Sequence, residues 1–516
     1  MTAMNRRNFL SGAAAILGAG IGTGYASSAQ AAATTPSVLP QKWDEECDVA
    51  VVGAGGAGLH AALQAHDAGA KVIVINKAAS SYHSATATCG GGFAAFGTKD
   101  QKKEGSDDTL EFFIDDILKF GNYQNNRALV KTWGIASGKA YDWMADRGLA
   151  PHHLEKYQGH NHLRYERQEN YTGRDYIDVL VKEAKDRKLK IISEAPLSKI
   201  YYDADKNEVL GIAAEKNGKT ISIRAKKGVV LAAGGFTGDP AFFDQWAPHI
   251  GGNGVCIGAP SNDGKALMIA VRDCGAPISH MQYFASYPCG VQTRLRNGIF
   301  HRYWYIVDEG GILVNKNGER FCSERLGQTK VGELLAGQPE NCHYILVDEE
   351  GWKAARKNHP ANALFALPAW TDERIDQEVE ADRIIFSEPT LESLALKAGI
   401  DEKKLAETVA RWNEYVAQKK DPDFGREADD MKRPLGKGPY YAVKMTFWAN
   451  LVLGGLRVNG DLQVLNWSNQ PIKGLYAAGE ICAGAHGNSF LGGNGVSFAC
   501  ASGYAAGQNV VKFAKA

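Results

Sequence analysis

Residues 53–58 have the types and the spacing that bind a phosphate group. They read Gly-Ala-Gly-Gly-Ala-Gly, which matches the pattern G-x-G-x-x-G. In this pattern the first glycine permits a tight turn, the second lets backbone N–H groups approach a pyrophosphate, and the third lets a helix pack closely on a strand. The sequence therefore predicts that the diphosphate of a dinucleotide is held by Gly53, Gly55, Gly56, Ala57 and Gly58.

The segments around this turn are the ones that must position it. Residues 48–52 and 71–75 are rich in valine and isoleucine, and residues 59–65 are rich in alanine. The order strand, turn, helix, strand places the positive end of the helix beside the phosphates. After the second strand, Asn76 stands where an acidic side chain usually holds the ribose hydroxyls. We expect its amide to bind the diol instead.

Two later strands end in small residues. Residues 228–235 are apolar and end in glycines, and residues 474–480 end in glycine and glutamate. Small residues at a strand end let a large flat group pass close to the backbone, and a carboxylate there is suited to ribityl or ribose hydroxyls. The residues expected to contact this group are Ala233, Gly234, Gly235, Gly479 and Glu480.

Residues 492–495, Gly-Gly-Asn-Gly, are predicted to open the last helix, which runs to about residue 513. The cofactor contacts expected from this helix start are Asn494, Gly495 and Val496. The N–H groups at a helix start favour negative charge, so this helix is expected to stabilise an anionic reduced ring. Earlier in the chain, helices are expected at 107–120, 126–148 and 173–188, and separate short strands at 220–224 and from 228 onward.

Residues 1–31 have the features of an export signal. Arg6 and Arg7 form a twin-arginine pattern, a glycine- and alanine-rich stretch follows, and Ala29-Gln30-Ala31 is a small-x-small cleavage site. The apolar stretch is too short and too rich in glycine for a membrane span. We expect a folded protein exported to the periplasm with no transmembrane span; an ordinary secretory signal is the alternative.

Composition excludes several classes of function. Among 516 residues, 58 are basic and 58 are acidic, so nothing indicates a nucleic-acid partner. The nine cysteines include no C-x-x-C pair, which excludes c-type haem attachment and predicts no essential disulfide. The four histidines between residues 152 and 162 lack fixed ligand spacing, so we interpret them as part of a polar loop and expect no metal site.

Eight segments together resemble one family. They are 53–58, 232–235, 262–264, 315–321, 439–444, 454–455, 475–480 and 486–497, and they resemble the FAD-dependent fumarate reductase family, which includes flavocytochrome c and urocanate reductase. The resemblance implies an α/β fold: a discontinuous Rossmann-like FAD-binding domain with an inserted α+β capping domain. The implied parts are 32–281 and 452–516 for FAD and 282–451 for the cap.

The resemblance also implies further FAD contacts. These are Lys77, Ser84, Gly90, Gly91, Asn262 and Asp263. Membrane-bound relatives tether FAD through a histidine in this loop, but the aligned residue here is Ser84, one position after His83. FAD is therefore expected to be non-covalent.

The family's fumarate-binding residues are replaced. Tyr287 stands where a histidine precedes proline, and Leu451 where a histidine precedes the paired glycines. Gln328 aligns with the proton-donating arginine, and Phe490 with the arginine that clamps a carboxylate. A buried carboxylate without an arginine partner costs several kcal/mol, so fumarate is expected to bind poorly. Trp448 would add to an apolar substrate pocket.

The resemblance implies hydride transfer from flavin N5 to an activated C=C bond, with a side chain that protonates the neighbouring carbon. The candidate proton donors are Tyr287 and Arg325, the latter if a helix presents it one turn before Gln328. Tyr441 is a candidate for polarising a carbonyl. Electrons are expected from a separate cytochrome c or quinol-linked donor. The alternatives are a ketosteroid-type dehydrogenase working in the opposite direction and a flavin electron-transfer protein without substrate chemistry.

Overall fold

The structure, a computed structural model, describes residues 39–150, 152–157, 159–168, 172–248, 255–256, 258–292, 297–300, 303–357 and 370–512. The predicted export signal in residues 1–31 lies outside them. Within these ranges we find no helix with the length and apolarity that a membrane span needs.

Eight of the described strands form the larger sheet, in the order β19-β20-β8-β9-β1-β2-β6 with β7 beside β8. Strand β1 lies at its centre, parallel to β2 and to the end of β9. Every side chain of β2 is buried, as expected for a parallel strand covered on both faces. The bounds are β1 (Glu45–Val52), β2 (Val72–Asn76), β6 (Lys190–Ser193), β7 (Leu197–Asp203), β8 (Glu208–Lys216), β9 (Lys219–Leu231), β19 (Gln463–Leu465) and β20 (Pro471–Ala477).

Strand β9 corrects one prediction. The pattern indicated two strands, at 220–224 and from 228, but β9 is a single strand over both segments. Its first half pairs antiparallel with β8, and its second half pairs parallel with β20. The polar residues at 226–227 look like a break in the sequence because the strand passes from a partly exposed hairpin into the buried sheet there.

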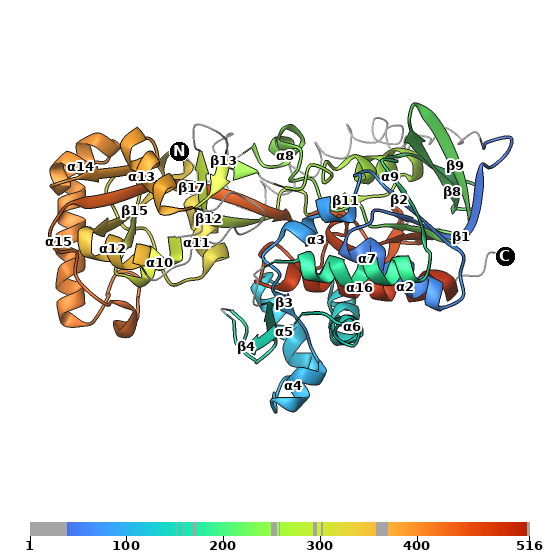
Figure 1. Cartoon of the computed structure of the whole chain (residues 1–516), viewed down its shortest axis with the longest axis horizontal. Helices are drawn as coiled ribbons and strands as arrows, with labels where there is room; N and C mark the ends of the chain where they lie inside the picture. The colour runs from blue at the N-terminus through green and yellow to red at the C-terminus, as the bar shows by residue number, and fades with distance from the viewer. Residues whose placement is uncertain are drawn as a thin grey trace, which may run out of the picture.

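Two helices, α2 and α16, pack against the strands of this sheet. The C-terminal helix α16 lies against α2 (Figure 1), and glycines make this close crossing possible. A Cβ on Gly503 would lie 2.2 Å from the carbonyl oxygen of Ala57. The helices of this part are α2 (Gly56–Asp67), α3 (Ala85–Thr88), α4 (Lys99–Lys103), α5 (Leu110–Phe120), α6 (Arg127–Ala145), α7 (Arg174–Asp186), α8 (Pro240–Trp246), α9 (Lys265–Cys274) and α16 (Asn494–Lys512).

A second sheet forms the cap at the other end of the molecule (Figure 1). Its strands are β10 (Val255–Cys256), β12 (Phe284–Gln292), β13 (Asn297–Ile299), β14 (Ile312–Val314), β15 (Cys342–Asp348), β16 (Ile385–Glu388) and β17 (Tyr440–Val452). Its helices are α10 (Tyr303–Asp308), α11 (Gln328–Leu335), α12 (Glu349–Lys357), α13 (Asp372–Ala381), α14 (Leu391–Ala398) and α15 (Glu402–Gln418). A parallel sheet with an inserted second sheet confirms the predicted α/β fold class; the exact boundaries at 281/282 and 451/452 stay predictions.

Strand β17 connects the two parts. Its first residues pair with β15, and its last residues pair with β12. Val443 and Trp448 belong to the apolar core of the cap, whereas Phe447 and Val452 belong to the core of the larger sheet. The strand therefore carries side chains from the cap directly to the edge of the dinucleotide-binding fold.

A third sheet of three short strands lies where a polar loop was expected. Strands β3 (Phe93–Ala94), β4 (His152–Glu155) and β5 (Tyr165–Gln168) pair antiparallel in the order β3-β5-β4. His152 and His153 are therefore strand residues, and His160 is buried, with Nε2 2.8 Å from the carbonyl oxygen of Gly492. His152 and His153 are successive residues of β4, whereas His160 and His162 lie in the connection between β4 and β5, which explains the irregular spacing. Among the described residues, no group of metal-ligating side chains is found.

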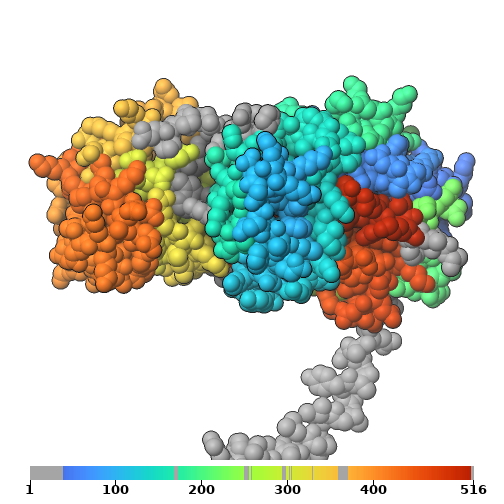
Figure 2. Space-filling model, turned by 90° about the horizontal axis from the view of Figure 1, so that it is seen from below, coloured from blue at the N-terminus to red at the C-terminus, as the bar shows by residue number. Residues whose placement is uncertain are grey.

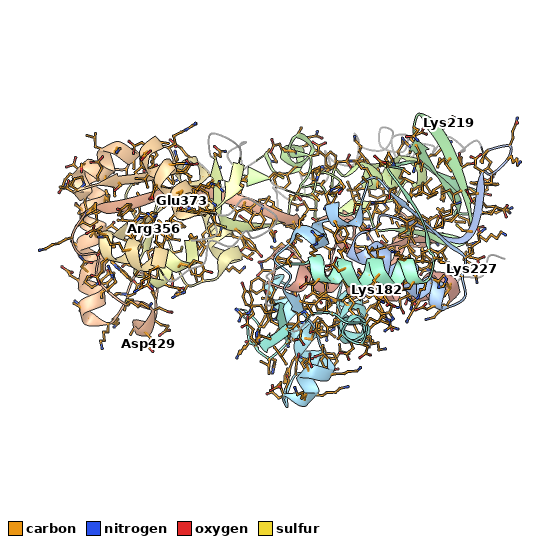
Figure 3. The ribbon with its side chains drawn as sticks, in the orientation of Figure 1. Lys182, Lys219, Lys227, Arg356, Glu373 and Asp429 are labelled. Carbon is orange, nitrogen blue, oxygen red and sulfur yellow. The ribbon has the colours of Figure 1, made fainter. Side chains whose placement is uncertain are left out.

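Charged side chains lie mostly at the surface. Lys182, Lys219, Glu373 and Asp429, labelled in Figure 3, are all exposed. Figure 2 shows the molecule from below, with the cap at one end, the segment of α5 and α6 in the middle and α16 beyond it.

Candidate active site

A cavity of about 470 Å³ lies between the larger sheet and the cap. The sequence predicted twenty cofactor contacts, and eighteen of them line this cavity: Gly53, Gly55, Gly56, Ala57, Asn76, Lys77, Ser84, Gly90, Gly91, Ala233, Gly234, Gly235, Asn262, Asp263, Gly479, Glu480, Gly495 and Val496. The other two, Gly58 and Asn494, lie directly beside lining residues. Segments more than four hundred residues apart thus meet around one space.

The glycine turn has the geometry that the pattern requires. Gly53 has φ +106°, and a Cβ on it would lie 2.3 Å from the carbonyl oxygen of Ala232. A Cβ on Gly58 would lie 1.9 Å from the carbonyl oxygen of Gly53, so this glycine allows α2 to approach the strand. Any larger side chain at either position would push the turn away from the cavity.

Asn76 uses part of its amide to hold the turn. Its Oδ1 accepts the N–H of Ala54 at 3.3 Å, and its Nδ2 donates to the carbonyl of Ala78 at 2.8 Å. An amide has two donor hydrogens and two acceptor lone pairs, so one of each remains on this side chain, which lines the cavity. Binding of a diol by Asn76 stays a prediction.

Glu480 is a half-buried carboxyl group that follows β20 by three residues. Its two oxygens accept the N–H of Val452 at 3.0 Å and the amide of Asn262 at 3.1 Å. Burial raises its pKa to about 7, although the hydrogen bonds from Val452 and Gly235 act in the opposite direction. The group can therefore change its protonation state near neutral pH.

The nucleotide end of the cavity also carries an ion pair. Lys77 Nζ lies 2.6 Å from Asp263 Oδ2, and Lys265 Nζ lies 3.3 Å from the same oxygen. Burial alone would raise the pKa of Asp263, but the hydrogen bond from Lys77 and the neighbouring contacts with Lys265 lower it overall. Asp263 is therefore charged at neutral pH.

The start of α16 has an unsatisfied amide. Asn494 is 1% exposed, and neither its Oδ1 nor its Nδ2 has a hydrogen-bond partner among the described residues. Leaving such a group without a partner costs about 1–3 kcal/mol. An unpaired buried amide directly beside residues that line the cavity fits a polar cofactor bound there, and together with the glycine cradle it fits FAD.

The other end of the cavity is apolar. The residues predicted to bind the substrate or to donate the proton line this end: Tyr287, Trp448, Leu451 and Phe490. The rings of Tyr287 and Trp448 meet edge to face at 5.3 Å. A Cβ on Gly495 would lie 3.6 Å from both Leu451 and Phe490, so this apolar end adjoins the start of α16.

Two of the other predicted catalytic residues are not brought to the cavity. Arg325 precedes α11 instead of lying on it, and its guanidinium pairs with Asp308 at 2.7 Å and Asp430 at 3.1 Å. Tyr441 stacks on Trp352 at 4.5 Å inside the cap. Neither lines the cavity. Gln328 is the first residue of α11, and its side chain lies outside what the structure describes.

The sequence analysis missed the contribution of the third sheet. Glu155, Tyr157, Tyr165 and Arg167 line the cavity, and the rings of Tyr157 and Tyr165 stack at 4.3 Å. These residues alternate along the chain, at 155, 157, 165 and 167, which is the period-2 pattern of one strand face. The alternation was a usable signal, but the histidines obscured it.

The loop at residues 83–84 places a serine, not a histidine, at the cavity. Ser84 lines the cavity and its Oγ accepts the N–H of Ala87 at 3.3 Å, which caps α3. His83 is exposed and does not line the cavity. Non-covalent attachment stays a prediction.

Comparison with known proteins gives the same assignment. The family described as FAD binding domain matches residues 48–496. A fumarate reductase (cytochrome) of Shewanella frigidimarina is 31% identical over 470 residues, which cover 91% of this chain and 77% of that protein. A urocanate reductase of Eggerthella lenta is 28% identical over 486 residues, covering 92% and 76%. The open conformation of a flavocytochrome c3 fumarate reductase superposes with a TM-score of 0.72 at 28% identity, covering 100% of this chain and 82% of that one. The chain therefore belongs to the FAD binding domain family, and it is an FAD-dependent oxidoreductase of the fumarate reductase type that acts on carbon–carbon double bonds.

Proposed function

We propose that this protein is an exported reductase for the activated C=C bond of a largely apolar or aromatic conjugated acceptor, and that fumarate is a poor substrate. The observation that carries the proposal is the apolar end of the cavity, formed by Tyr287, Trp448, Leu451 and Phe490. Aromatic faces bind conjugated rings by stacking and by removing apolar area from water. One relative is named for urocanate, a conjugated acid with an aromatic ring, which supports the same substrate class.

The charged residues of the cavity support the exclusion of a dicarboxylate. The described lysines and arginines of its lining are Lys77, Lys265 and Arg167. The two lysines contact Asp263, and Arg167 lies 3.4 Å from Glu155. A dicarboxylate would have to displace a carboxylate of the chain from its cation, which weakens binding.

His486 supports the same conclusion. Its side chain lines the cavity, and burial lowers its pKa to about 3. At neutral pH it is an uncharged imidazole, so it offers a dicarboxylate no positive charge. The same neutral ring meets Phe490 edge to face at 5.3 Å and extends the aromatic wall.

FAD, when bound, supplies hydride from N5 to the β-carbon of the acceptor. Trp448 and Phe490 hold the acceptor and exclude water. Tyr287 gives the proton to the neighbouring carbon. Burial raises the pKa of Tyr287, against a hydrogen bond with Asn450 that lowers it, so the hydroxyl stays protonated at neutral pH. Gln328 has no titratable group and cannot replace it.

The proposal includes a separate electron donor, a cytochrome c or a quinol-linked carrier. The sequence contains no C-x-x-C-H haem site, and a relative is named fumarate reductase (cytochrome). Export by the twin-arginine route rests on residues 1–31. A reporter fused to residues 1–40 should reach the periplasm, and a control with Arg6→Lys and Arg7→Lys should stay in the cytoplasm; equal export of both would contradict this part.

Anaerobic oxidation of reduced viologen tests the acceptor. Purified holoenzyme is given cinnamate-like acids, enones and fumarate at equal concentration. We expect oxidation with the aromatic acids or enones and much less with fumarate. Fumarate as the best acceptor would refute the substrate assignment. No acceptor at all would favour a flavin electron-transfer protein, and desaturation of a ketosteroid with an artificial oxidant would favour the dehydrogenase.

A further inference from the structure

The peptide between Gly91 and Gly92 belongs to the cavity lining and accepts a hydrogen bond from a tyrosine that does not line the cavity. The hydroxyl of Tyr176 donates to the carbonyl oxygen of Gly91 at 2.7 Å. Gly91 has φ +79°, a conformation that a glycine adopts without strain.

This hydrogen bond also fixes the direction of the Gly92 N–H, which belongs to the same peptide. Gly91 and Gly92 line the cavity, whereas Tyr176 does not. In a planar trans peptide the C=O and the next N–H point in opposite directions. Because the Gly91 carbonyl points toward Tyr176, the N–H of Gly92 points away from Tyr176. Among the described residues, no group accepts a hydrogen bond from this N–H.

Tyr176 is itself held firmly. It lies on α7, is 0% exposed, and packs against Phe93 at 5.6 Å and His152 at 6.1 Å between ring centres. Burial raises the pKa of Tyr176, so its hydroxyl stays protonated. The hydroxyl is therefore a permanent donor in a fixed place.

We propose that Tyr176 is a positioning residue that sets the flavin potential: by holding the Gly91 carbonyl, it directs the N–H of Gly92 at the bound cofactor. An N–H donor favours the state of a ligand with more negative charge, which for a flavin is the reduced ring. Removing the Tyr176 hydroxyl lets the peptide rotate, and the reduced flavin loses a donor. The inference needs bound FAD but not the identity of the acceptor.

The test is the midpoint potential of the flavin in Tyr176→Phe holoenzyme, measured by spectroelectrochemistry. The change removes one oxygen atom and keeps the ring. We expect binding of reduced FAD to weaken about tenfold relative to oxidised FAD, as loss of a hydrogen bond to a charged group implies. For a two-electron couple this is a fall of about 30 mV. An unchanged or higher potential overturns the proposal.

Tyr141→Phe is the matched control. Tyr141 is 1% exposed and packs on the same Phe93 ring at 5.5 Å, but its hydroxyl donates to Glu166 at 3.3 Å and does not contact the glycine turn. Its removal should leave the potential unchanged. An equal fall in Tyr141→Phe would assign the effect to general loosening of this core and overturn the role of Tyr176.

A second replacement keeps the test decisive if Tyr176→Phe does not fold. With 3-fluorotyrosine at position 176 the hydroxyl is a stronger donor, which polarises the peptide and makes the Gly92 N–H a better donor in turn. The potential should then rise. No rise in correctly folded, flavin-bound protein refutes the inference. A failure of every acceptor in the viologen assay would leave these potentials unaffected, so the two proposals can fail separately.

Discussion

The side-chain amide of Asn262 donates to the half-buried carboxyl group of Glu480 at 3.1 Å, across 218 positions of sequence. The second oxygen of Glu480 accepts the N–H of Val452 at the end of β17. One carboxyl group thus joins both halves of the FAD-binding fold to the strand that leads into the cap. The protonation state of Glu480 therefore affects both halves of the fold and this strand.

The stability of flavin-free protein should depend on Glu480 in a defined direction. Burial raises its pKa from 4.5 to about 7, so the folded state binds a proton that the unfolded chain releases. The stabilisation from Glu480 is full below pH 4.5 and is lost as pH rises through 7, a change of about 3 kcal/mol. Chemical unfolding of wild type and Glu480→Gln at pH 4.5 and pH 8 measures it. If the difference between the two proteins does not change with pH, Glu480 does not titrate as described.

Gly53→Ala should abolish most flavin binding. The new Cβ would lie 2.3 Å from the carbonyl oxygen of Ala232, and this contact with backbone can be relieved only by moving the turn. Gly97→Ala is the matched control, because Gly97 also has positive φ (+78°) but no atom lies within 4 Å of its added Cβ. The ratio of flavin to protein absorbance after purification measures the effect. Similar flavin loss in both variants would mean that backbone strain alone is responsible.

Tyr287→Phe should lower turnover about 10²- to 10⁴-fold, the usual contribution of a general acid, with the absorbance of bound FAD unchanged. Arg325→Gln is the comparison, since Arg325 pairs with Asp308 and Asp430 away from the cavity. It should keep its turnover with the best acceptor. Normal turnover in Tyr287→Phe together with a large loss in Arg325→Gln would transfer the proton-donor role to Arg325.

Phe490→Arg should restore part of the ability to use a dicarboxylate. The guanidinium would enter the apolar end of the cavity and offer a charged hydrogen bond, which is expected to raise kcat/KM for fumarate about tenfold or more. The ratio of kcat/KM for fumarate to that for an aromatic acid measures the change. Phe490→Leu keeps an apolar side chain and should leave fumarate poor. A gain in Phe490→Leu would show that space, and not charge, limits fumarate.

The cofactor turn was predictable because its chemistry is local. Gly53, Gly55 and Gly58 are required by a turn of six residues, and the buried strand and helix around them follow from short-range patterns. The small residues at 233–235 and 479 were likewise readable from their strands. The replacement of the family's fumarate-binding residues at 287, 451 and 490 follows from the resemblance and stays a prediction, although those three residues do line the cavity.

Other features could not be read from the chain because they depend on which segments pair. Arg325 looked available beside Gln328, but two acidic residues distant in sequence neutralise it. The contact of Tyr176 with Gly91 requires α7 to pack behind the glycine turn, and Tyr165 reaches the cavity only through the register of β5 on β3.

The sequence by itself determined that the chain binds a dinucleotide in a Rossmann-like fold, since this depends on residue types at short spacing. The tertiary structure alone decided which side chains face the cavity, which cations are already paired and which hydroxyl holds the glycine peptide. The physical reason is that burial, strand register and ion pairing arise between segments far apart in the chain, and no local pattern specifies them.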